Sequence, residues 1–222
     1  MGQGRIVLVG GAEVGDQALG QWLLGEAGGS RVLAVATAAA FDAPEQAMVN
    51  LATWLGPLGA EVEGIMALNR GDAEIVELAD KVASADLVYL VEGSAMHLRT
   101  ALKGTKILEA ISGVLARGGL LVASGGAAVA LCDPMVDPRG GAPTVGLGLV
   151  RDLAVVTHVG ADPDDPSGEK LHRGLSLFGP EVPVVALAER ARCVIDEHGV
   201  HLEGTATVYL AGQVAVDHFA TS

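Results

Sequence analysis

The sequence predicts an α/β fold in three layers: a doubly wound, mostly parallel sheet with helices on both faces. Two observations support this. Short apolar runs alternate with helix-like segments along the chain, which is typical of strand–helix–strand units. Hydrophobic residues make up 50% of the chain but aromatic residues only 3%, so Val, Leu, Ile and Ala must build the core. Such residues suit a parallel sheet that is buried on both faces. We expect one domain over residues 1–222.

The first part of the chain alternates strictly between the two kinds of element. Pro44 is favourable in the first turn of a helix, and the apolar residues of 73–84 recur at helical spacing. Continuous apolar runs predict strands over 5–9, 31–36, 62–65, 87–91 and 120–123. Helices are expected over 17–26, 43–58, 73–84, 96–102 and 106–115.

The pattern changes after Leu131. Residues 133–148 are rich in Gly and Pro and predict a long loop. The turn sequence at 196–199, Asp-Glu-His-Gly, indicates a hairpin. We expect a strand over 153–157 ending at His158, a helix over 170–177, and hairpin strands over 182–187, 192–195, 200–203 and 205–210.

Charge and composition exclude several classes of protein. The formal net charge is −13, which argues against a binder of nucleic acid or of anionic membranes. No apolar stretch approaches the ~18 residues of a membrane span, and the start of the chain lacks a signal-peptide pattern. We therefore expect a cytoplasmic protein. The two cysteines form no CxxC pair and the histidines show no ligand spacing, so no metal is expected.

An apolar run ends on a hydroxyl at Ser124, and the small residues Gly125 and Gly126 follow directly. A sharp turn from strand to helix holds a nucleophile clear of the sheet. Small residues after the turn let the backbone bend tightly and let a substrate approach. A serine that caps a buried helix, or a small-residue contact between helix and sheet, are the alternative interpretations.

Several segments resemble, in the same order, those of the cyanophycinase and dipeptidase E family of serine peptidases. VASGGA (122–127) resembles the family's elbow, G-T-S-A-G-A, and the segment 89–111 looks like its strand, glycine turn and helix. GLGLVRDLAVVTHVG (146–160) is similar to the segment that ends in the catalytic histidine, while 184–196 and 205–212 resemble the closing strands. The resemblance implies a fold like that of class I glutamine amidotransferases.

The resemblance also implies a catalytic set. Ser124 would be the nucleophile and His158 its general base, because a serine hydroxyl needs a base to attack. A carboxylate would orient the histidine, and Glu189 falls where the family has an acid near the site. Asp133 and Asp137, after the elbow helix, are the alternatives for this third member.

The remaining site residues follow from the same resemblance. The oxyanion hole would use the backbone N–H of Gly125 and that of Gly93 or Ser94. Glu92, Ala95 and His97 would line the substrate pocket. Glu92 stands where the family has glycine, Ala95 where cyanophycinase-like members have glutamine, and Val122 where the elbow has its first glycine. Residues expected to contact the substrate therefore differ from those of the family.

The resemblance implies a hydrolase for short peptides or isopeptides, with an acidic residue before the scissile bond. It implies an acyl-enzyme on Ser124, no metal or organic cofactor, and a homodimer. Two alternatives remain open. An altered site could make the chain a binding protein without catalysis. The glycine-rich segment 7–20 could bind a nucleotide, although the resemblance explains these glycines as a turn after the first strand.

Overall fold

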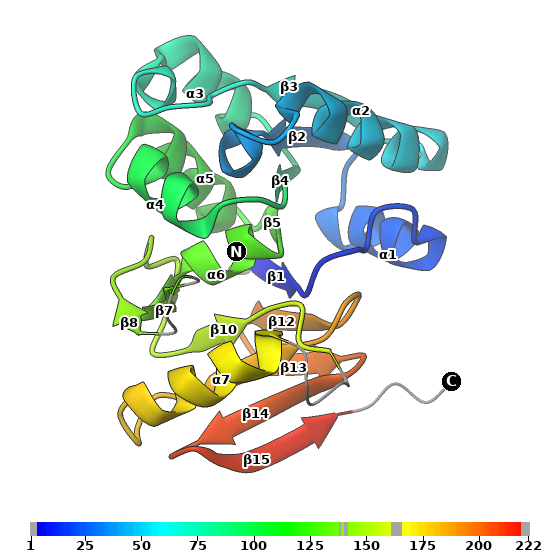
Figure 1. The fold of residues 1–222 in the computed structure, drawn as a ribbon. Coiled ribbons are helices and arrows are strands. Elements are labelled where there is room, and N and C mark those ends of the chain that lie inside the picture. The colour runs from blue at the N-terminus through cyan, green and yellow to red at the C-terminus, as the bar shows by residue number, and fades with distance from the viewer. Residues whose placement is uncertain (1–3, 138, 140–141, 161–165, 219–222) are drawn as a thin grey trace.

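The computed structural model describes residues 4–137, 139, 142–160 and 166–218. A seven-stranded sheet with the order β13-β12-β1-β5-β4-β2-β3 forms its centre (Figure 1). The strands from β1 to β3 in this order pair in parallel, and β12 and β13 are antiparallel. The strands are β1 (Arg5–Val9), β2 (Arg31–Val35), β3 (Glu61–Ile65), β4 (Leu87–Leu90), β5 (Leu120–Ser124), β12 (Arg192–Asp196) and β13 (Gly199–Glu203). The predicted α/β class with a mostly parallel sheet is confirmed.

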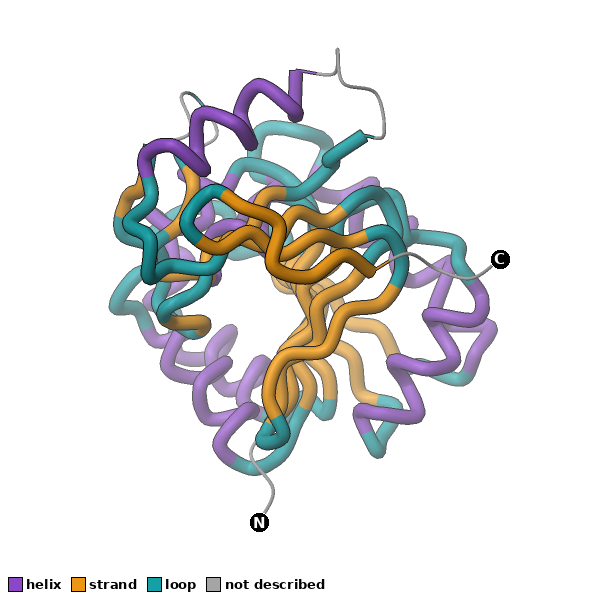
Figure 2. Tube along the Cα trace, turned by 90° about the horizontal axis from the view of Figure 1, so that it is seen from below, coloured by secondary structure: helices purple, strands orange, loops and turns teal. Residues whose placement is uncertain are grey.

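Helices cover both faces of this sheet, because successive side chains of each buried strand point to opposite sides. In β1, Ile6 and Leu8 join one hydrophobic cluster, while Val7 and Val9 join the other. Figure 2 shows the strands in the middle with helices on either side. One face packs against α1 (Gln17–Ala27) and α2 (Pro44–Leu55); the other packs against α3 (Val76–Ala83), α4 (Ala95–Leu102), α5 (Lys106–Ala116) and α6 (Gly126–Leu131).

Two predicted helices are shorter than expected. The helix expected over 43–58 ends at Leu55 and continues as a 3-10 turn, Gly56–Leu58, which contains Pro57. The helix expected over 73–84 is divided by Ile75, which is extended at φ −69° and ψ 119°. A 3-10 turn, Asp72–Glu74, precedes this break. In the described part of the chain, no helix has the length and apolar character needed to cross a membrane.

A second sheet follows in the C-terminal part, with the order β10-β11-β14-β15. Its strands are β10 (Ala154–Val156), β11 (Val184–Leu187), β14 (Ala206–Leu210) and β15 (Gln213–His218), and α7 (Pro166–Leu177) lies over it in Figure 1. Strand β15 was not predicted. The expected loop over 133–148 carries short two-stranded pieces, formed by β6 (Cys132–Asp133) with β9 (Val150–Arg151) and by β7 (Met135–Val136) with β8 (Pro143–Thr144).

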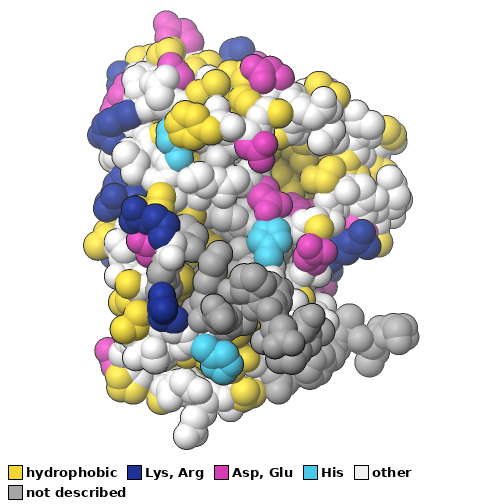
Figure 3. Space-filling model, in the orientation of Figure 1, with side chains coloured by type: hydrophobic (Ala, Val, Ile, Leu, Met, Phe, Trp, Pro, Cys, Tyr) yellow, Lys and Arg dark blue, Asp and Glu magenta, His cyan; other side chains and the backbone are white. Residues whose placement is uncertain are grey.

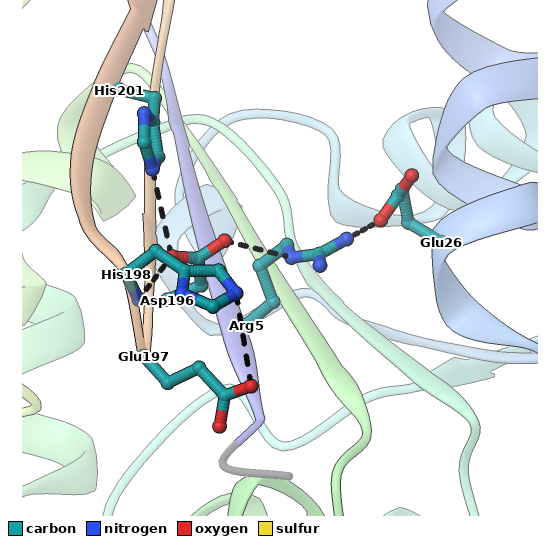
Figure 4. Close-up of polar contacts among 6 residues, drawn as sticks. All are labelled: Arg5, Glu26, Asp196, Glu197, His198 and His201. Atoms are coloured by element: carbon teal, nitrogen blue, oxygen red, sulfur yellow. Dashed lines mark hydrogen bonds and ion pairs between the residues drawn. The ribbon is translucent and has the colours of Figure 1, made fainter.

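Arg5 ties the antiparallel pair β12–β13 to the parallel strands (Figure 4). Its guanidinium forms an ion pair with Glu26 of α1 and lies 3.6 Å from the carboxylate of Asp196. Asp196 also accepts a hydrogen bond from the backbone N–H of His198 at 2.8 Å, and His201 lies 3.6 Å away. The His198 hydrogen bond is the main cause that lowers the pKa of Asp196. The hairpin therefore meets β1 through a charged cluster at its turn.

Candidate active site

The turn between β5 and α6 is an elbow whose central residue is Gly125. Ser124 is the last strand residue and pairs with Val9 of β1, and α6 begins at Gly126. Gly125 lies between them at φ 52° and ψ −119°, a conformation that residues with side chains rarely adopt. A strained turn of this kind, from strand to helix, is where α/β hydrolases present their nucleophile. The elbow position of this chain therefore has no side chain.

Glu92 and His158 occupy the space beside this elbow. Glu92 Oε1 lies 2.5 Å from His158 Nε2. A β-carbon placed on Gly125 would come within 2.7 Å of the Glu92 carboxylate. The carboxylate and the imidazole therefore form a hydrogen-bonded pair at the point where an elbow side chain would project.

The backbone holds His158 in place after β10. His158 has a positive φ of 56°, and its N–H donates to the carbonyl of Gly10 at 3.1 Å. Its ring lies directly against Gly11, where a β-carbon would be 2.2 Å from Cε1. A β-carbon on Gly10 would similarly meet the Ala188 carbonyl oxygen at 1.9 Å. These close approaches explain why glycine is needed at positions 10 and 11, so a nucleotide-binding role is not required to account for them.

The surroundings of His158 favour its charged form. The hydrogen bond that His158 donates to the Glu92 carboxylate is the largest influence and raises the pKa of His158. Partial burial acts in the opposite direction, because it penalises the imidazolium. The negative charges of Glu92, Glu189 and Glu13 add to the increase. The site is thus an acidic environment around one histidine.

Two of the three amides expected in the oxyanion hole are already used. The N–H of Gly125 donates to the Val9 carbonyl at 3.0 Å, as part of the β1–β5 pairing. The N–H of Ser94 donates to the Ala38 carbonyl at 2.8 Å. Neither can stabilise an oxyanion without breaking these bonds, so the expectation for Ser94 and Gly125 is not met.

Gly93 and Gly126 provide the available amides instead. Within the described ranges, neither N–H has a hydrogen-bond acceptor, and Gly126 is the first residue of α6. The two residues are close together, since a β-carbon on Gly126 would lie 2.0 Å from the Gly93 carbonyl oxygen. Gly93 is one of the two residues considered from the sequence for the second amide, and it lines a cavity in front of the elbow. Gly126 follows from the elbow geometry, because the residue after the elbow supplies an amide in such sites.

A cavity of about 310 Å³ opens in front of this turn and is lined by Glu92, Gly93 and His158. Ala95, at the start of α4, lies in its wall as expected for a pocket residue. Figure 3 shows acidic side chains and a histidine together near the middle of one face. The volume of the cavity in front of Gly125 is at the lower end of the range for small-molecule pockets.

Ser124 lies in a neighbouring cavity of about 240 Å³ rather than beside His158. Its side chain is buried and lines this cavity together with Tyr89 and Glu13. The Tyr89 hydroxyl donates to the Glu13 carboxylate. No hydrogen bond joins Ser124 to His158 in the part of the chain that the structure describes. The expected serine–histidine pair is therefore not brought together here.

The three acids proposed for the histidine do not bond to it. Glu189 is exposed and influences His158 through its charge alone. Asp137 forms an ion pair with Arg139 at 2.8 Å, and Asp133 does not line the cavity of His158. Glu92, which we expected in the substrate pocket, is the carboxylate that contacts the histidine. The sequence contains one indication of this role: Glu92 is a charged residue in a turn where the family has glycine.

His97 does not line this cavity. Its Nε2 lies 2.7 Å from the Leu68 carbonyl oxygen, and its ring makes an edge contact with Phe41 at 4.7 Å between centroids. The expectation that it lines the pocket is not met. No group of three or more His, Cys, Asp or Glu side chains that could hold a metal is present among the described residues.

The fold and the elbow place this chain among α/β proteins with a hydrolase-type site at the end of a central strand. A family model of Peptidase family S51 matches residues 6–203, and the chain therefore belongs to this family. This confirms the resemblance to the cyanophycinase and dipeptidase E family, and it supports the predicted class of enzyme, a peptidase-type hydrolase.

Solved structures share the fold. A peptidase from an acI-B1 Actinobacterium superposes with a TM-score of 0.81 at 19% identity, covering 100% of this chain and 96% of that one. A peptidase E-type protein from Listeria monocytogenes EGD-e gives a TM-score of 0.69 at 16% identity, covering 90% and 98%. No curated protein matches the chain by sequence. At these identities the structural similarity concerns the fold.

Proposed function

We propose that this chain hydrolyses short peptides or isopeptides in the cavity in front of Gly125, with Glu92 and His158 as the acid–base pair. The observation that carries the proposal is the 2.5 Å contact between Glu92 and His158 at the elbow. Membership of a peptidase family supports hydrolysis as the reaction class. The empty elbow position favours water as the attacking group, because no side chain projects from Gly125.

The proposed reaction is a direct hydrolysis. Glu92 takes a proton from a water molecule as its oxygen attacks the scissile carbonyl carbon. The N–H groups of Gly93 and Gly126 stabilise the negative charge that forms on the carbonyl oxygen. The C–N bond breaks as protonated His158 gives its proton to the leaving nitrogen. Proton transfer from Glu92 to His158 restores the pair, so one water is consumed and an acid and an amine are released.

An acyl-enzyme on Ser124, with His158 as base, is the other route to the same products. The serine-peptidase character of the family supports it. In this route Ser124 Oγ must leave the cavity that it shares with Tyr89 and reach the imidazole of His158, which is paired with Glu92. The arrangement of these groups therefore favours water over Ser124.

Peptide binding without hydrolysis is a second candidate function, and Gly125 is the observation that favours it. An elbow without a side chain lacks the nucleophile that a covalent mechanism requires. The cavity and its two amide donors would still bind the carbonyl group of a peptide.

A mixture of short peptides, analysed by mass spectrometry, distinguishes these functions. Direct hydrolysis predicts that Ser124→Ala retains turnover, that Glu92→Gln and His158→Gln lose it by at least about a hundredfold, and that a fluorophosphonate does not label the protein. A Ser124 adduct, together with inactive Ser124→Ala, would support the acyl-enzyme. Retention of peptides by the wild-type protein without any cleavage would support the binding function and overturn both routes.

A further inference from the structure

The wall of the cavity in front of Gly125 is aliphatic. Five buried side chains from four different elements form it, and each exposes 7% of its surface or less. They are Ala95 of α4, Val129 of α6, Val136 of β7, and Val155 and Val156 of β10. A ligand side chain that enters this cavity would leave water for a dry, branched surface, which favours a branched apolar group.

The charged side chains that line the cavity are Glu92 and His158, which are paired with each other. Glu92 lines it, and Glu13 and Glu189 act electrostatically on the same histidine. No Lys or Arg side chain lines the cavity in the part of the chain that the structure describes. A carboxylate entering here would lose its hydration, would find the imidazole of His158 already paired with Glu92, and would be repelled by the negative charge of Glu92.

We propose that this cavity binds the residue next to the scissile bond when its side chain is an uncharged, branched aliphatic group such as that of valine or leucine. Aspartate and glutamate are excluded. The inference rests on the proposed function for the location of the scissile bond. It replaces, for this chain, the acidic preference that the family resemblance implied.

Val129 is the residue best placed to set the size of the accepted side chain. It lies on α6, three residues after Gly126, whose N–H is one of the two available amide donors. It is 7% exposed and lines the cavity. A larger side chain at this position would fill the cavity, and a smaller one would deepen it.

Binding of small amides tests the proposal without requiring turnover. The probes are N-acetyl-L-leucinamide, N-acetyl-L-phenylalaninamide and N-acetyl-L-aspartic acid α-amide, titrated at pH 7 with the full chain and followed by NMR. We expect the leucine probe to bind at least about tenfold more tightly than the aspartic probe. Val129→Phe should weaken the leucine probe about tenfold, and Val129→Ala should shift the preference toward the phenylalanine probe.

Val49→Ala is the matched control, because Val49 lies on α2 and is 56% exposed. It should leave all three affinities unchanged. If Val129→Phe does not fold by circular dichroism, the change in preference in Val129→Ala decides the test. Equal or tighter binding of the aspartic probe, unchanged preferences in the Val129 variants, or no binding of any probe would overturn the proposal. Selective binding of the leucine probe by a protein that cleaves nothing would contradict only the proposed hydrolysis.

Discussion

Gly125 and Glu92 are complementary: the residue at the elbow has no β-carbon, and the Glu92 carboxylate lies 2.7 Å from where that β-carbon would be. Glu92 reaches this place from the turn after β4, and it bonds to His158 there. A serine at 125 and a glutamate at 92 therefore compete for the same volume. Several tests follow from this relationship and from the buried and charged groups around it.

The double variant Glu92→Gly with Gly125→Ser should create a reactive serine. Removal of the carboxylate frees both the space at the elbow and the Nε2 atom of His158, so a hydroxyl at 125 gains a base beside it. We expect one fluorophosphonate adduct, at position 125, in the intact mass. Gly125→Ser alone should label poorly because Glu92 blocks it. Equal labelling of wild type and double variant would refute the elbow assignment.

Gly125→Ala should destabilise the protein by about 1–3 kcal/mol, because alanine must adopt φ 52° and its β-carbon meets Glu92. Gly113→Ala is the matched control. Gly113 lies in the interior of α5 with no heavy atom within 4 Å of the added β-carbon, so alanine should stabilise by about 0.5–1 kcal/mol. Urea denaturation measures the free energy of unfolding of both variants. An unchanged free energy of unfolding in Gly125→Ala would contradict the strained turn.

Glu92→Gln should lower the pKa of His158 toward 6.5, because the hydrogen bond to Glu92 is the main cause that raises it. A pKa raised in the folded state contributes stability that is fully present below 6.5 and is lost as pH rises through the folded value. The stability difference between wild type and variant should therefore shrink as pH rises above 6.5. NMR titration of the His158 ring tests the shift, and an unchanged midpoint would contradict it.

Asp196→Asn should reduce the pH dependence of stability in acid. The His198 N–H and the nearby positive groups lower the pKa of Asp196 below 3.8. A lowered pKa contributes stability that is present above 3.8 and is lost as pH falls through the folded value. Urea midpoints of wild type and variant, compared from pH 6 downward, should converge below pH 3.8. Parallel curves across this range would show that Asp196 contributes nothing.

Cys132 and Cys193 should not react with Ellman's reagent in the native protein. Both are free thiols at 0% exposure, and burial raises the pKa of Cys193 to about 12 and that of Cys132 further. A thiol reacts as the thiolate, so these side chains are unreactive as well as inaccessible. Both should titrate on addition of urea above the unfolding midpoint. Fast labelling of either thiol in native buffer would argue against this packing.

Apolar runs were sufficient to predict the main sheet. Strands such as β4 are buried on both faces, so their sequences are hydrophobic without interruption, and the strand over 5–9 was predicted to the residue. Strand β15 was missed because its side chains are largely exposed: Val214 and Val216 expose 55% and 53% of their surface. Periodicity reports burial, so an exposed edge strand gives a weak signal.

The candidate site was predicted in location but not in detail. His158, Gly93 and Ala95 were expected at the cavity and lie there. The elbow lies one residue later than expected, because β5 continues through Ser124, which pairs with Val9. A shift of one residue turns a side chain to the other face of the sheet. The Ser124 hydroxyl therefore lies in the cavity lined by Tyr89. Apolar periodicity alone does not predict the last residue of a strand to within one position.

The complementarity of positions 92 and 125 makes them epistatic. A serine introduced beside Glu92 is crowded, and a glycine introduced at 92 deprives His158 of its carboxylate while the elbow still lacks a hydroxyl. Each single substitution is expected to impair the site, and only the double substitution places a serine hydroxyl beside a free His158 imidazole. Two substitutions therefore separate these chemistries on one scaffold, and a search of single mutants for serine reactivity would not find the route between them.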